Sequence, residues 1–124
     1  MINQILLFIG SFLTIVWGMA HLFPTRSVVK NFGDISIDNK RIITMEWIIE
    51  GVTLIYIGSL IAIITIIDFQ NLISTVVLTS SGVMLLLLAL ISTLTGFRVN
   101  FLPYKLCPFI FTVSAALILI GTYV

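Results

Sequence analysis

Long hydrophobic stretches without charged residues occupy most of the chain and predict its secondary structure. Charged side chains are missing from residues 1–25, 51–67, 69–97 and 106–124. A helix that spans a bilayer needs about 20 mainly apolar residues, whereas a spanning strand needs about 9–11 residues of alternating polarity. These stretches are long and do not alternate. They predict an all-α integral membrane protein whose single domain, residues 1–124, is a four-helix transmembrane bundle.

The predicted spans leave connections of different length. We place the spans at about 2–23, 42–67, 72–95 and 105–123, with an interfacial loop at 24–41. Within that loop, residues 25–32 have the pattern of a short helix that Gly33 ends. Asp38 is suited to the N-cap of the second span. The connection at 68–71 is so short that the second and third spans are expected to be antiparallel neighbours.

Composition excludes a water-soluble fold. Hydrophobic residues make up 60% of the chain and charged residues 9%, and the mean hydropathy is +1.25. A soluble domain carries roughly 25% charged residues. The lipid bilayer is therefore the expected partner. A net charge of +1 gives no footprint for nucleic acid. Cys107 is the only cysteine, so a disulfide within the chain is excluded, and we interpret it as a small apolar residue near a helix start.

The basic residues predict the topology. All six lie in the first and third connections: Arg26, Lys30, Lys40, Arg41, Arg98 and Lys105. Basic residues are enriched in the cytoplasmic loops of membrane proteins. We therefore expect residues 24–41 and 96–105 to be cytoplasmic and both termini to lie outside, in a bacterial inner (plasma) membrane.

Two carboxylates in the second span are the most informative polar residues. Glu46 and Glu50 are four positions apart and share one helix face. Counting about 20 residues back from Asp68 places Glu46 among the headgroups and Glu50 inside the hydrocarbon region. An ionisable group there costs roughly 2.5–3.5 kcal/mol and suggests a function by default. The alternative is a protonated or ion-paired contact that only joins two helices.

The topology brings further polar residues to the same level. His21 ends the first span, while Arg98 and Tyr104 flank the third connection. We therefore predict a ligand-binding cluster, which comprises Glu50, His21, Arg98, Glu46 and Tyr104. It could hold the polar head of a quinone or lipid-like molecule, or transfer protons to and from such a substrate. A metal site of His21, Glu46 and Glu50 is disfavoured, because the chain lacks the repeated Glu-x-x-His of di-iron bundles.

Short motifs give the chain a resemblance to a known family. Between residues 8 and 60 it resembles DoxX-like membrane proteins through Gly18-x-x-His21-Leu22-Phe23-Pro24, Phe32-Gly33 and Glu50-Gly51-x-x-Leu54-x-x-x-Gly58. The resemblance implies a small four-helix bundle that is a quinone-linked oxidoreductase subunit or an accessory protein of a membrane redox complex. We expect a protein that binds a hydrophobic small molecule, alone, in a complex or as a homo-oligomer. An isomerase-like enzyme acting on a lipid or sterol-like substrate and a purely structural subunit are the alternatives.

Overall fold

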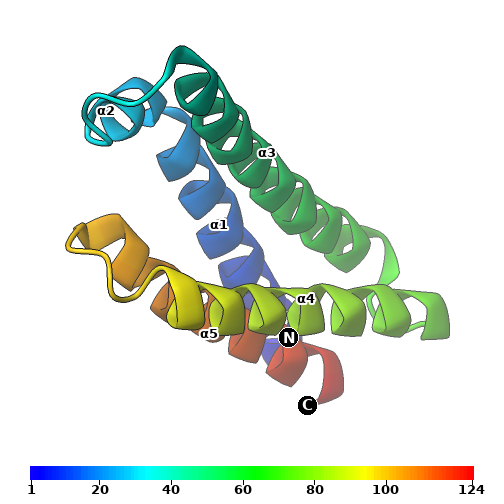
Figure 1. The fold of residues 1–124 in the computed structure, drawn as a ribbon. Coiled ribbons are helices and arrows are strands. Elements are labelled where there is room, and N and C mark those ends of the chain that lie inside the picture. Colours follow the sequence, from blue (N-terminus) through cyan, green and yellow to red (C-terminus); the bar gives the residue numbers. More distant parts are fainter.

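The computed structural model describes residues 1–124 as five helices and no strand (Figure 1). The helices are α1 (Ile2–Leu22), α2 (Thr25–Lys30), α3 (Ile37–Asp68), α4 (Leu72–Thr95) and α5 (Leu102–Tyr123). All except α2 are long and apolar enough to cross a membrane. The predicted all-α fold with four candidate membrane-spanning helices is thereby confirmed.

The second long helix begins earlier than its hydropathy predicted. Ser36 is the N-cap of α3, and its hydroxyl accepts a hydrogen bond of 3.2 Å from the backbone N–H of Asn39. The predicted N-cap at Asp38 was therefore wrong, and this carboxylate lies in the first turn of the helix. With 32 residues α3 is about 48 Å long, which exceeds the hydrocarbon core of a bilayer, about 30 Å. Its polar first turns therefore extend beyond the apolar stretch.

The short helix in the first connection forms as predicted, although it ends two residues early. Residues Thr25–Lys30 make up α2, and Gly33 follows with a φ of +73°. That left-handed conformation favours glycine because the residue has no Cβ atom. Gly33 therefore reverses the chain between α2 and α3.

The four long helices pack as two pairs that are joined through α1 and α5. Helix α1 packs against α3 and α5, and α4 packs against α5. Figure 1 shows α3 and α4 diverging from the turn that connects them, and few of their residues are in contact. The expectation that these two helices pack as antiparallel neighbours was therefore wrong over most of their length. Their divergence leaves room for a pocket at the end of the molecule that carries α2.

Small residues let α1 and α3 approach backbone to backbone. A Cβ atom built on Gly18 would lie only 2.7 Å from the carbonyl oxygen of Gly51. Nearby, the hydroxyl of Ser11 donates a hydrogen bond of 2.7 Å to the carbonyl of Gly58. Close approach through small residues is typical of helix pairs in membranes. It places the end of α1 directly beside the middle of α3.

The outer surface is apolar, as a lipid environment requires. The core holds fully buried side chains such as Leu7, Ile61 and Leu85, but many large hydrophobic residues outside it are exposed. Phe12, Ile66 and Ile73 are 65–76% exposed. An exposed apolar surface of this extent marks contact with lipid or another apolar partner. The fold and its surface define an integral membrane protein.

Candidate functional site

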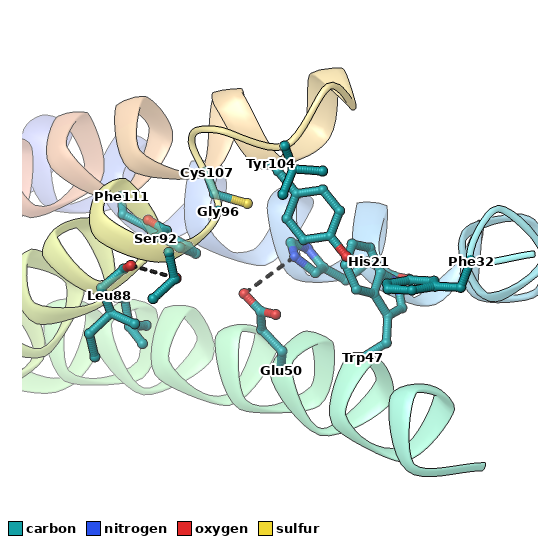
Figure 2. Close-up of a pocket in the computed structure, with 13 residues that line it drawn as sticks. His21, Phe32, Trp47, Glu50, Leu88, Ser92, Gly96, Tyr104, Cys107 and Phe111 are labelled. Carbon is teal, nitrogen blue, oxygen red and sulfur yellow. Dashed lines mark hydrogen bonds and ion pairs between the residues drawn. The ribbon is translucent and has the colours of Figure 1, made fainter. Parts of the chain in front are cut away.

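A pocket of about 490 Å³ lies where α3 and α4 diverge. Residues from all five helices, or from the turns beside them, line this pocket. They are His21 from α1, Phe32 after α2, Trp47 and Glu50 from α3, residues between Leu88 and Val99 from α4 and the turn after it, and Tyr104, Cys107 and Phe111 from α5. Eight of the 13 lining residues are hydrophobic. Figure 2 shows the polar side chains of His21 and Glu50 facing one another across this space. The site is therefore an apolar pocket with one polar wall, which His21 and Glu50 form.

His21 is oriented by a hydrogen bond within its own helix. Its Nδ1 lies 2.8 Å from the backbone carbonyl oxygen of Trp17, and the residue is only 2% exposed. A carbonyl oxygen can only accept, so Nδ1 carries a hydrogen. The other ring nitrogen, Nε2, is turned toward Glu50 and lies 3.4 Å from its Oε1 atom. This nitrogen is buried and has no hydrogen-bond partner.

Aromatic neighbours hold the imidazole in place. The ring of Trp17 meets it edge-on at a centroid distance of 5.5 Å, and the ring of Trp47 lies tilted at 4.7 Å. The indole N–H of Trp47 donates a hydrogen bond to the backbone carbonyl of His21. The hydroxyl of Thr25 donates to the same carbonyl at 3.1 Å. The last turn of α1 is thus attached to both α2 and α3.

Glu50 and Glu46 occupy different surroundings although they are one turn apart. The side chain of Glu50 is 39% exposed and lines the pocket, and its Oε1 atom lies 3.4 Å from His21 Nε2, an ion pair when the imidazole is protonated. Glu46 is exposed, does not line the pocket and has no ion-pair partner. Glu50 lies 18 residues before Asp68, the last residue of α3, which corresponds to about 27 Å along the helix. Of these two carboxylates, only Glu50 is therefore placed to contact a molecule in the pocket.

Of the five residues predicted to form a cluster, the structure brings three together. His21, Glu50 and Tyr104 line one pocket. Arg98 does not line it: this residue lies exposed in the turn after α4, where its guanidinium remains available to water or lipid headgroups. The inclusion of Arg98 and Glu46 in the cluster is thus not supported, because a shared level in the membrane does not determine which way a side chain points.

The structure adds Cys107, which the sequence presented as an ordinary apolar residue. It is 5% exposed, and its sulfur lies within 4.8 Å of ligating atoms of both His21 and Glu50. A signal was present, since Tyr104, Cys107 and Phe111 have the spacing of one helix face. Trp47 was also missed as a pocket residue, and no pattern in the sequence distinguishes it from other buried aromatic residues.

Comparison with known proteins returns no relative: no protein family model, no curated protein and no solved structure matches the chain.

Proposed function

We propose that this membrane protein binds an amphiphilic small molecule in the pocket, with the apolar body against α4 and α5 and a polar oxygen head at His21 and Glu50. The observation that carries the proposal is the pocket itself, with a volume of about 490 Å³ and a largely hydrophobic lining. Small-molecule sites have volumes of about 300–1,000 Å³ and few polar groups in fixed positions. A fixed imidazole and a carboxylate at one wall meet that description.

A quinone or a lipid-like molecule is the class of ligand that suits both halves of the site. Its ring or chain would occupy the apolar part of the pocket, which Leu88, Ile91 and Phe111 line. Its carbonyl or hydroxyl oxygen would exchange hydrogen bonds with the polar wall. The resemblance to DoxX-like proteins points to the same class and to a place in a membrane redox complex. We further propose that the protein resides in a bacterial inner membrane with both termini outside.

Intrinsic fluorescence offers a direct test, because the chain has only two tryptophans and both contact His21. A quinone with a short isoprenoid tail, titrated into the full-length protein in detergent, is expected to quench this fluorescence to saturation. Glu50→Gln is expected to weaken binding by about tenfold, since a hydrogen bond to a charged group contributes roughly 1.5 kcal/mol. Glu46→Gln is the matched control and is expected to bind like the wild type.

Three results would overturn this proposal. Quenching that does not saturate in the wild type would favour the alternative of a purely structural subunit. A purified protein in which mass spectrometry finds no lipid or quinone would favour the same alternative. Equal affinity of the wild type and Glu50→Gln for the quinone would show that the polar wall does not take part in recognising the ligand.

A second candidate function is acid–base catalysis on a lipid-like substrate. It is favoured by the 3.4 Å separation between His21 Nε2 and Glu50 Oε1 at the wall of the pocket, where two groups able to carry a proton lie side by side. An isomerase of this type breaks a C–H bond at one carbon and forms another with a proton from the site. In deuterated water, the wild type would therefore introduce deuterium into components of a lipid extract, and Glu50→Gln would not. No incorporation by the wild type would exclude this candidate.

A further inference from the structure

The chemistry of His21, Glu50 and Cys107 extends beyond hydrogen bonding to an organic ligand. The three residues come from α1, α3 and α5, and their ligating atoms all lie within 4.8 Å of one another. We propose that they bind a divalent transition-metal ion of the zinc type at the wall of the pocket. The proposal rests on the geometry of the three side chains and does not require an amphiphile to bind.

The orientation of His21 is that of a metal ligand. Its Nδ1–H is held by the carbonyl of Trp17 at 2.8 Å, so in the neutral ring Nε2 presents a lone pair toward Glu50 and Cys107. Histidines that bind metals are commonly fixed by such a bond from the other ring nitrogen to a backbone carbonyl or carboxylate. Nε2 is also buried and without a hydrogen-bond partner. A lone pair opposite a carboxylate oxygen needs a proton or a metal cation between them, and the third ligand atom, the sulfur of Cys107, suits the metal cation.

The distances fit one shared ion after small movements. Zinc lies at about 2.0–2.3 Å from nitrogen, oxygen and sulfur ligands, so ligand atoms of one ion are roughly 3–4 Å apart. The His21–Glu50 separation of 3.4 Å lies in this range. The Cys107 sulfur lies within 4.8 Å of the other two ligand atoms, so a side-chain rotation that moves it by about 1 Å would bring it to the same ion. Glu50 is 39% exposed, and its carboxylate gives the ion a route to the buried nitrogen and sulfur.

The charges of the three ligands would also balance the charge of the ion, which lowers the cost of binding it within a membrane. A divalent ion bound to one carboxylate, one thiolate and a neutral imidazole has no net charge. An uncompensated charge in the membrane interior is costly, whereas a neutral complex avoids that cost. On binding, the S–H bond of Cys107 breaks, a sulfur–metal bond forms and the proton leaves to the solvent.

Three protein ligands leave one position of a tetrahedral ion unfilled. Sites of this kind, unlike structural sites with four protein ligands, hold water or substrate at the fourth position. Here that position would face the pocket between α3 and α4. If an amphiphile also binds, its oxygen head would be a suitable fourth ligand. The sequence disfavoured a metal site of His21, Glu46 and Glu50 because the chain lacks the repeated Glu-x-x-His of di-iron bundles, whereas the structure provides Cys107 as a third ligand.

The metal alone is the probe for the test. Full-length protein in detergent, freed of metal with a chelator, is titrated with Zn²⁺ against a chromogenic competitor, and one ion per chain is expected. Cobalt(II) in place of zinc is expected to give a sulfur-to-cobalt charge-transfer band and the strong visible bands of a tetrahedral ion. Cys107→Ser and Glu50→Gln are each expected to weaken zinc binding by at least about 100-fold, since even residues that only support metal ligands affect affinity by 10–100-fold. Glu46→Gln is expected to bind like the wild type.

Several outcomes would overturn the proposal. Wild-type protein that binds no zinc, or a cobalt complex without the sulfur band, excludes the site without relying on any variant. Zinc binding that survives both Cys107→Ser and Glu50→Gln would place the ion elsewhere. Ser92→Phe, which fills the pocket, is expected to retain zinc and to lose the amphiphile. Failure of the metal site can therefore be distinguished from failure of ligand binding.

Discussion

Gly18 of α1 and Gly51 of α3 face one another so closely that a Cβ atom on Gly18 would lie 2.7 Å from the Gly51 carbonyl oxygen. His21 is one turn beyond Gly18, and Glu50 immediately precedes Gly51. The glycine contact therefore determines whether the imidazole and the carboxylate can meet. The chemistry of the pocket depends on a backbone approach that no larger residue permits.

Gly18→Ala is expected to destabilise the protein by about 1–3 kcal/mol, because the added methyl group would overlap backbone atoms of Gly51 and Ile55, which cannot rotate away. Gly82→Ala is the matched control, since its Cβ would meet only side-chain atoms of Leu119. Both variants gain the same helix propensity. Denaturant unfolding in detergent, followed by circular dichroism, measures the difference. Equal stability of the two variants would contradict the proposed role of the glycine contact.

Trp47→Phe is expected to destabilise the protein, whereas Trp17→Phe is not. The indole N–H of Trp47 donates to the carbonyl of His21, so its removal is expected to cost about 1 kcal/mol. The indole N–H of Trp17 is buried without a partner, and its removal relieves an unsatisfied donor. We therefore expect Trp17→Phe to unfold at the same or a higher denaturant concentration than the wild type. A larger loss for Trp17→Phe than for Trp47→Phe would refute this assignment of donors.

The fold was largely predictable because lipid imposes a simple rule on the chain. Each uncharged stretch of about 20 residues must satisfy its backbone hydrogen bonds internally, and a helix does so. The start of α3 at Ile37 was not predictable in this way, because the Ser36 cap and the polar first turn carry no hydropathy signal. The divergence of α3 and α4 also escaped prediction, since a short turn fixes only where two helices meet.

The candidate site was predictable in part, and the reason lies in side-chain direction. His21 and Glu50 could be placed at one level from topology, and the structure shows them in contact at 3.4 Å. Arg98 shares that level but lies exposed in a turn. Cys107 was overlooked because a single cysteine resembles a small apolar residue until its neighbours on other helices are known. Hydrophobic patterning gives depth along a span, whereas the neighbours of a residue depend on the packing of the helices.

Ser92→Phe is expected to reduce binding of the short-chain quinone by at least about tenfold, because the ring would occupy the pocket that Ser92 lines. The folded protein loses little, since the Ser92 hydroxyl bonds only to the Ala89 carbonyl of its own helix. Thr93→Phe is the matched control: Thr93 bonds to the same carbonyl but does not line the pocket. Tryptophan quenching measures both variants. Equal affinity in the two would place the quinone outside this pocket.

The orientation of the molecule in the membrane is tested by reporters fused to its ends and loops. The pocket lies at the end that carries α2 and the turn after α4, and all six basic residues lie in α2, in that turn or in the first turns of α3 and α5. Since basic loops are retained on the cytoplasmic side, we expect this end to be cytoplasmic. A reporter enzyme that is active only in the cytoplasm should be inactive at either terminus and active when inserted after Gly33. Activity at the termini would reverse the topology, and the pocket would then open to the outside.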